Sequence, residues 1–487
     1  MWSGGFLIIL IKIQKFVRIF CRLNVNYVII ELKLSKSVLI NNNIYILPCC
    51  KGRVIMEILS LGEKIKRKRK ELNMTLKDLA GDRITPGQIS LVESGKSNPS
   101  MDLLEYLANT LNTTVEYLME SEETQAEKIC LFYENIAESL ILNSDLVQAE
   151  QNIEKSLYYS EKYKLEYRKA RNLSLRGDIY MARGEIAAAQ QVFLSSNVIF
   201  IKNNSYEEII KTFLKLGKIT LQLRGYQSAS SYFMQAEKVF LDNEMGNDFL
   251  LGEIYYYIGY TFFKLENIEN AIKYSYLAQE KFKQIDSKKE YANSLLLLAN
   301  EYNKNGDIKN AIKYSKITLK VFYEIDNLTY ISEIENNLGR LFYEFENMEQ
   351  SFIHLNKAKE IRQKNNDIKL IDTLANICEN YIKLKSVNRS KEALQHILEY
   401  VEDGNYKALH QYYLLKYRID LLEGNMNEAE HTLILALNFV KEQEQVKEAA
   451  EISIMLGKFY IECGRDTDAA KYLNEGVELF SKLGIIK

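Results

Sequence analysis

Apolar residues recur at helical spacing along most of this chain. Between residues 56 and 120 they fall into five short segments, and from residue 127 onward they form longer amphipathic segments that continue to the C-terminus. The chain has three prolines and none after residue 99, so the residue that most strongly interrupts helices is missing from the long second part. The pattern predicts an all-α protein, with a small five-helix domain ahead of an α-solenoid.

Capping residues mark the ends of the central two short helices. Thr75 precedes an apolar run and Asp78 follows three residues later, so a hydroxyl and a carboxylate can satisfy free amides of the first turn. Gly81 ends this helix, and Thr85 with Pro86 begins the next. Two helices of about two turns each, joined by a tight turn, are typical of a helix-turn-helix, whose second helix presents its N-terminal residues to the major groove of DNA.

Residues 75–80 (TLKDLA) and 89–100 (ISLVESGKSNPS) resemble the Cro/repressor (XRE) family of helix-turn-helix domains. The resemblance implies a domain at residues 56–120 that binds double-stranded DNA and is held together by an ion pair between Arg69 and Glu93. It also implies phosphate contacts and a base-reading turn and helix. The phosphate-contacting positions are Thr75, Lys96, Ser97 and Asn98, and the base-reading positions are Thr85, Pro86, Gly87, Gln88, Ser90 and Leu91.

Two features depart from the family pattern. The turn at residues 81–83 is one residue shorter than usual, and Pro86 and Gly87 lie where many relatives carry long polar side chains. Among the exposed candidates, Gln88 can pair with adenine through two hydrogen bonds and Thr85 can contact a thymine methyl.

A basic run at residues 64–70 (KIKRKRK) has two interpretations. Its side chains can form a solvated helix face, or they can contact the DNA backbone and make binding salt-dependent. Acidic residues nearby leave the domain close to neutral, so any positive field is a local patch.

Composition excludes several classes of function. The net charge of −2 gives no bulk attraction to nucleic acid or membrane. The six cysteines form no metal-binding spacing and are expected to be reduced thiols in a cytoplasmic protein, without disulfides, metal or cofactor. The sequence contains no glycine-rich phosphate loop and no nucleophile motif, so we do not expect an enzyme.

Residues 1–55 differ from the rest and lack helix caps and a sustained period. The apolar run at residues 6–11 is too short for a membrane helix, and a signal-peptide cleavage pattern is missing. We interpret this segment as a translated upstream extension, with Met56 as the natural start, or as a disordered arm.

Residues 127–487 repeat with a period near forty. A small residue recurs in each unit, followed by a short polar link and a second small residue; examples are Gly177, Gly217, Gly259, Gly339 and Gly457. The array resembles tetratricopeptide repeats, which stack as helix pairs into a superhelix. About nine pairs are expected. A repressor-like domain ahead of such an array is similar to the peptide-responsive Rgg, PlcR, PrgX and NprR regulators.

The resemblance to tetratricopeptide repeats places the first helix of each unit on the concave face. Tyrosine, amide and guanidinium groups at these positions suit an extended peptide, because amides pair with its backbone and a cation binds a carboxylate. The alternative is an ordinary solvated surface. The candidate peptide-binding residues are Tyr256, Tyr260, Asn300, Asn303, Asn336, Arg340 and Asn376.

Together these features predict a DNA-binding transcriptional regulator that acts as a homodimer, without membrane contact, and senses a short signalling peptide through its repeats. The rival hypothesis is a tetratricopeptide scaffold that binds another protein and has little specific affinity for DNA. The shortened turn and the Pro86-Gly87 pair favour this rival.

Overall fold

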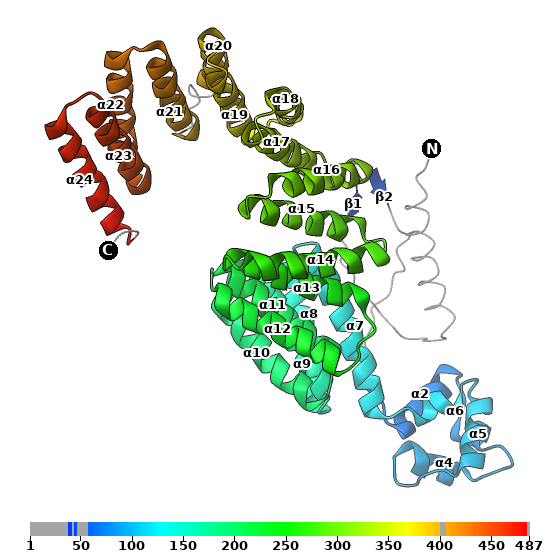
Figure 1. Ribbon diagram of the computed structural model, residues 1–487. Coiled ribbons are helices and arrows are strands. Elements are labelled where there is room, and N and C mark those ends of the chain that lie inside the picture. The colour runs from blue at the N-terminus through cyan, green and yellow to red at the C-terminus, as the bar shows by residue number, and fades with distance from the viewer. Residues whose placement is uncertain (1–37, 41–42, 46–56, 400–405, 485–487) are drawn as a thin grey trace. The chain divides into compact units, whose positions relative to one another are not determined.

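A computed structural model describes residues 57–399 and 406–484, together with the backbone of a small hairpin (Figure 1). In the hairpin, β1 (Val38–Ile40) pairs antiparallel with β2 (Asn43–Tyr45), and Leu39 lies opposite Ile44. The remainder of residues 1–55, which we interpret as an extension or arm, lies outside the described residues.

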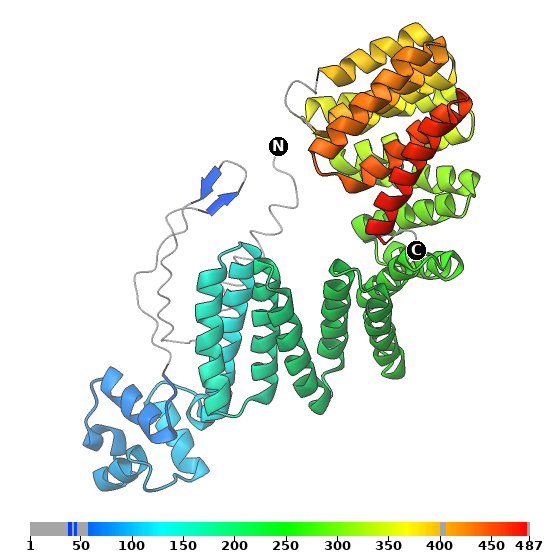
Figure 2. The same ribbon diagram turned by 90° about the vertical axis from the view of Figure 1, so that its left-hand side faces the viewer.

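Helices make up nearly all of the described chain, which confirms the predicted all-α class (Figures 1 and 2). The small N-terminal domain contains α2 (Leu61–Glu71), α3 (Leu76–Ala80), α4 (Pro86–Glu93), α5 (Met101–Thr110) and α6 (Val115–Met119). The array contains α7 (Glu122–Leu142), α8 (Leu146–Lys162), α9 (Glu166–Arg183), α10 (Ile186–Lys202), α11 (Tyr206–Gln222), α12 (Tyr226–Asp242), α13 (Asp248–Lys264), α14 (Ile268–Gln284), α15 (Lys288–Lys304), α16 (Ile308–Ile325), α17 (Leu328–Glu344), α18 (Met348–Lys364), α19 (Leu370–Lys383), α20 (Val387–Leu398), α21 (Tyr406–Glu423), α22 (Met426–Glu442), α23 (Val446–Glu462) and α24 (Asp466–Lys482). In the described chain, no helix is long and apolar enough to span a membrane.

The helix-turn-helix begins and ends at the predicted capping residues. Thr75 and Asp78 form a reciprocal capping box at the start of α3, and Thr85 caps α4 with Pro86 in the first turn. The prediction of two turns for the first helix was wrong, because α3 has only five residues. Gly81, with φ of 51°, ends it in a backbone conformation that favours glycine.

A close approach between α2 and α4 sets the geometry of the small domain. A Cβ added to Gly62 would lie 2.4 Å from the carbonyl oxygen of Glu93 and 2.5 Å from that of Val92. These obstacles are backbone atoms, so only glycine lets the two helices come this close. The domain core is apolar and fully buried, and its members include Ile65, Leu79, Ile89, Leu107, Leu111 and Leu118.

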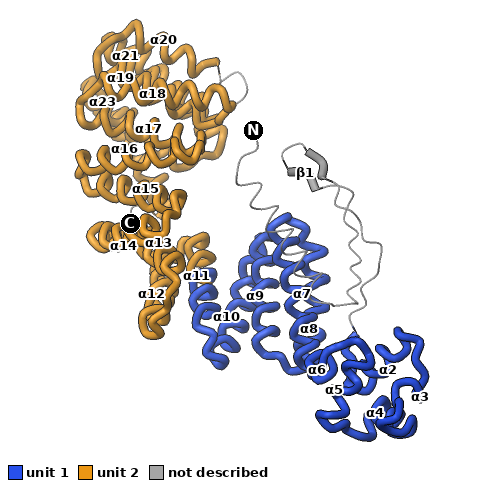
Figure 3. Tube along the Cα trace, turned by 90° about the vertical axis from the view of Figure 1, so that its right-hand side faces the viewer, with its two compact units in different colours: residues 1–215 blue, residues 216–487 orange. Residues whose placement is uncertain are grey.

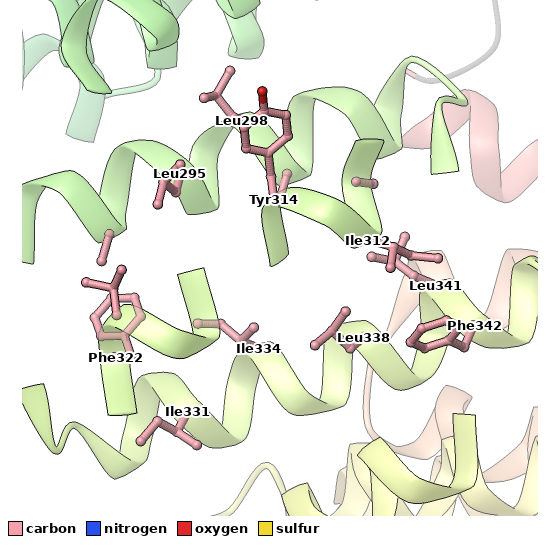
Figure 4. Close-up of a cluster of buried hydrophobic side chains, with 14 residues drawn as sticks. Leu295, Leu298, Ile312, Tyr314, Phe322, Ile331, Ile334, Leu338, Leu341 and Phe342 are labelled. Atoms are coloured by element: carbon pink, nitrogen blue, oxygen red, sulfur yellow. The ribbon is translucent and has the colours of Figure 1, made fainter. Parts of the chain in front are cut away.

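Contacts between Cα atoms divide the chain into two compact units, residues 1–215 and 216–487 (Figure 3). Within each unit, successive array helices pack as antiparallel neighbours around clusters of buried apolar side chains, which we call the seam. Figure 4 shows one stretch of this seam in the second unit, where Leu295 and Leu298 of α15, Phe322 of α16, and Ile334 and Leu338 of α17 are buried together. Each helix buries one face against its neighbours, as expected for a solenoid.

In several units the small residue is required by a large side chain on the following helix. A Cβ on Gly177 of α9 would lie 2.5 Å from the ring of Phe193 on α10, sixteen residues later. Gly339 stands in the same relation to Leu355. Gly259 differs, because an added Cβ would lie 2.7 Å from the hydroxyl of the small Ser275. The position that repeats near every forty residues is therefore a close approach between the two helices of a unit.

In the turns between paired helices, a residue in the left-handed conformation lies two positions before the second helix. Gly306, with φ of 77°, holds this place before α16. Before α12 the same place is held by Arg224, with φ of 59°, although Gly225 is the next residue and has φ of −80°. The left-handed residue of these turns is therefore not always a glycine.

The small-to-large match predicts strong coupling between Gly177 and Phe193. Gly177→Ala should destabilise the array by about 1–3 kcal/mol, because the added methyl group meets an immobile buried ring. In a Phe193→Ala background the same change should cost less than about 0.5 kcal/mol, because the obstacle is gone. Urea unfolding followed by circular dichroism measures all four proteins of this double-mutant cycle.

Gly87→Ala is the matched control, because its added methyl group would meet only the Thr85 hydroxyl, at 3.9 Å. Additive effects of the Gly177 and Phe193 changes would contradict the proposed match.

Candidate functional site

The orientation of α4 determines which of its side chains can meet DNA. Ile89 and Val92 are buried in the domain core, at 0% and 3% exposure. At about 100° per residue, the side of the helix opposite this pair carries Gly87, Ser90 and Leu91. All three are exposed. We call Gly87, Ser90 and Leu91 the outward face of α4.

Thr85 and Gln88, for which the sequence predicted a thymine-methyl contact and a paired contact with adenine, form a reciprocal capping box at the start of α4. The Thr85 amide donates to Gln88 Oε1 at 3.0 Å, and the Gln88 amide donates to Thr85 Oγ1 at 3.3 Å. The side-chain carbonyl of Gln88 therefore already accepts a hydrogen bond from the Thr85 backbone. A paired contact with adenine would require this capping box to open. Pro86 lies exposed in the first turn between them.

The predicted phosphate-contacting positions lie on the surface of the same domain. Thr75, Lys96, Ser97 and Asn98 are all exposed. The Thr75 hydroxyl donates to Asp78 at 2.7 Å, and hydrogen bonds from the Thr75 backbone and side chain lower the pKa of Asp78. The Lys96 ammonium has no hydrogen bond or ion pair within the described part of the chain, so its charge is available to an anion.

Arg69 and Glu93 join three elements of the domain. Arg69 Nε donates to Glu93 Oε1 at 2.6 Å, and Nη2 donates to Oε2 at 2.9 Å. The remaining Nη1 donates to the Met74 carbonyl ahead of α3, at 2.9 Å. The hydrogen bonds to Glu93 raise the pKa of Arg69. This two-pronged geometry fixes orientation as well as distance, because the guanidinium and carboxylate planes must align.

Most of the basic run at residues 64–70 is used inside the domain. Lys64 is buried, and its ammonium donates to the carbonyls of Tyr117 at 2.9 Å and Glu120 at 2.6 Å. Desolvation by burial lowers the pKa of Lys64. Lys68 pairs with Glu71 at 3.1 Å, and Arg67 pairs with Glu57 at 3.2 Å.

Lys66 and Lys70 are the exposed cations of the run that have no ion pair among residues 57–399 and 406–484. The solvated-face interpretation is therefore wrong for Lys64, which is buried, while Arg67, Lys68 and Arg69 pair with carboxylates of the domain. The positive charge available to an anion on this helix is small.

Hydrogen bonds tie the small domain to the first helix of the array. Gln125 of α7 accepts from the Leu59 amide at 3.0 Å and donates to the Leu59 carbonyl at 2.9 Å. The Lys64 ammonium of α2 donates a second link to this junction, a hydrogen bond to the Glu120 carbonyl just before α7. The segment before α2 and the end of α6 are thus both held at the start of α7.

A second candidate site lies on α17 and α19 of the second unit. A cavity of about 80 Å³ is lined by Arg340, Tyr343, Glu344, Leu355, Asn376, Glu379 and Asn380. At its edge, Asn376 Nδ2 donates to Asn336 Oδ1 at 3.1 Å. Three of the predicted peptide-binding residues, Asn336, Arg340 and Asn376, therefore come together here.

Charge pairing leaves one cation available in this cavity. Glu379 is bound to Arg418 at 2.8 Å, and Asn380 donates to the Ser351 hydroxyl at 2.8 Å. Arg340 is exposed and has no hydrogen bond or ion pair within the described residues. A ligand carboxylate is the partner that its guanidinium suits best.

The other predicted peptide-binding residues do not line this cavity. Tyr256 and Tyr260 lie on α13, where burial raises the pKa of Tyr256, and Lys264 sits 5.2 Å from the centre of the Tyr260 ring. Asn300 and Asn303 are exposed on α15.

Sequence reasoning missed Tyr343, Glu344 and Asn380 as lining residues. Their spacing of three or four residues from Arg340 and Asn376 was the available signal. Among the described residues, no group of three histidine, cysteine, aspartate or glutamate side chains could hold a metal ion.

Comparison with known proteins agrees with this geometry. A helix-turn-helix family model matches residues 65–118. The HTH-type transcriptional regulator DdrOP3 of Deinococcus deserti is 38% identical over 66 residues, which are 13% of this chain and 51% of that protein. The chain thus spans about half the length of this curated relative.

Solved structures resemble the array. The apo form of RapI matches with a TM-score of 0.57 and 15% identity, over 74% of this chain and 99% of RapI. The apo form of the quorum sensor NprR from B. thuringiensis matches with a TM-score of 0.48 and 14% identity, over 73% of this chain and 99% of that chain. The likeness to RapI shows a shared helical-repeat fold, and the protein therefore combines an XRE-type helix-turn-helix domain with tetratricopeptide-like repeats.

Proposed function

We propose that the protein is a sequence-specific DNA-binding transcriptional regulator whose repeats form a homodimer and sense a short peptide. The observation that carries this proposal is the outward face of α4. Gly87, Ser90 and Leu91 point away from a rigid core, on a helix of the size that enters a major groove. The similarity to a curated transcriptional regulator over this domain supports the same assignment.

Backbone contacts would come from the loop after α4 and from the start of α3. Lys96 offers an unpaired cation, while Ser97 and Asn98 offer neutral hydrogen-bonding groups beside it. With few free cations, non-specific affinity for DNA should be modest, so useful occupancy depends on base contacts.

The cavity on α17 and α19 supports the peptide part of the proposal. Arg340 would bind a peptide carboxylate, and the Asn336 and Asn376 amides would exchange their mutual hydrogen bond for bonds to a peptide backbone. A volume of about 80 Å³ fits one small side chain or a chain terminus. The rest of an extended peptide would follow the inner helices toward Asn300 and Tyr260.

The proposed dimer interface is the exposed apolar side of α10. Residues 186–201 contain no charged side chain, and Leu194, Val198 and Ile201 are 43%, 53% and 51% exposed on one side of the helix. A surface that pairs with its own copy places like residues near each other, so an uncharged apolar face suits self-association. Two copies would present two recognition helices to half-sites about 34 Å apart.

The rival function is a scaffold that binds another protein through the array. The single hydroxyl on the outward face of α4 favours this rival, since hydrogen bonds to bases carry much of ordinary sequence recognition. The DNA experiment below separates the two.

The full-length protein should enrich particular sequences from a random duplex library. Lys96→Ala should weaken binding to all of them to a similar degree and lower the slope of log affinity against log salt by about one, because one phosphate contact is lost. Fluorescence anisotropy at several salt concentrations measures both effects. Lys458→Ala in the array is the control. A library without enriched sequences would favour the scaffold.

Arg340→Gln should weaken the binding of peptides with a free C-terminal carboxylate. Loss of a charged hydrogen bond should reduce affinity at least about tenfold. A pooled library of short linear peptides, prepared with free and with amidated C-termini, provides the probe, and bound peptides are identified by mass spectrometry. Lys320→Gln, an exposed cation of α16, should change nothing. Equal retention of both pools by the wild type would refute the carboxylate contact.

Val198→Glu should convert the homodimer to monomers, because two copies would bring carboxylates together in an apolar interface. Sedimentation velocity of the full chain measures the change. Leu435→Glu, an exposed apolar residue of α22, is the control and should leave the dimer intact. A dimer that survives Val198→Glu would exclude α10 from the interface.

A further inference from the structure

The outward face of α4 has little capacity for hydrogen bonding. Ser90 supplies its one hydroxyl. The neighbouring Ser94 hydroxyl donates to the Leu91 carbonyl at 3.1 Å, and the Gln88 carbonyl is held in the capping box. The Arg83 guanidinium, ahead of α4, lies over the Tyr106 ring, 5.6 Å from the ring centre. The groups that recognise guanine or adenine through paired hydrogen bonds are therefore missing from this face.

Leu91 is the large side chain of the same face. It is 46% exposed on a helix whose other apolar residues, Ile89 and Val92, are buried. An exposed leucine alone is ordinary, but this one lies on the surface that would meet the bases.

Gly87, one turn before Leu91, leaves the helix backbone bare. Its φ is not positive, and an added Cβ would meet only Thr85 Oγ1, at 3.9 Å, so neither conformation nor packing requires glycine here. A bare backbone lets the first turn of α4 approach the floor of a groove closely, which brings Leu91 within van der Waals distance of base edges.

The apolar group in the major groove is the 5-methyl of thymine. We infer that Leu91 reads thymine methyl groups and that the DNA sequence bound by this protein is specified mainly by thymines, with Ser90 as the only polar reader on the face. This inference rests on the proposed DNA-binding function. One buried methyl group corresponds to about a fourfold difference in affinity.

Deoxyuridine tests the inference because it lacks only the methyl group of thymidine. Duplexes selected by the full-length protein are resynthesised with deoxyuridine in place of one thymidine at a time, and their affinities are measured by fluorescence anisotropy. The wild type should lose about threefold or more at one or two thymidines in each half-site. Leu91→Ala should bind the unmodified duplex more weakly and should be indifferent to the same replacements.

Met119→Ala is the matched control, because Met119 is an exposed apolar residue at the end of α6 in the same domain. It should keep the full sensitivity to deoxyuridine. Circular dichroism of each variant reports that the helices are intact.

Two different failures are distinguishable. If no sequence is selected from the library, the proposed DNA-binding function itself fails. If sequences are selected but no deoxyuridine replacement weakens wild-type binding, or if the sensitivity persists in Leu91→Ala, thymine methyl readout by Leu91 is overturned while the DNA-binding function stands.

Discussion

The ion pair between Arg69 and Glu93 holds the small domain in one geometry. It joins α2 to the end of α4 and, through the Met74 carbonyl, to the segment before α3. Gly62 allows the two helices to meet closely enough for this contact. Because Glu93 is fixed, the rotation of α4 about its axis is fixed as well, and that rotation directs Gly87, Ser90 and Leu91 outward. The chemistry offered to DNA thus depends on a contact made by a residue outside that face.

Charge in this domain stabilises structure more than it attracts ligands. The basic run of α2 looks like a nucleic-acid footprint, yet Lys64 is buried under backbone carbonyls, and Arg67, Lys68 and Arg69 pair with carboxylates. The same Lys64, with Gln125, attaches the domain to the start of α7. The cations of the run thus join the domain to the array as well as holding its own helices.

Local chemistry explains how much could be predicted from the sequence. Helix class and capping depend on residues that are close in the sequence, so Thr75, Gly81 and Thr85 mark helix ends where the pattern placed them. The competition of roles at Gln88 was not visible, because one side chain can either cap a helix or read a base, and spacing does not decide between them. The cavity on α17 and α19 depends on long-range contacts such as that between Glu379 and Arg418, which leaves Arg340 unpaired. The left-handed Arg224 follows Gly217 by seven residues, as Gly184 follows Gly177, so the repeat register indicates this turn residue although a glycine stands next to it.

The space around Gly87 affects which substitutions the domain can accept. A position at the centre of a recognition surface normally carries a side chain whose loss or replacement disturbs its neighbours. Here a new side chain meets open space, so a descendant gene can acquire a different residue at this position without refolding its domain. If the outward face of α4 contacts bases as proposed, one substitution at Gly87 would add a side chain to that face without disturbing the buried core of the domain.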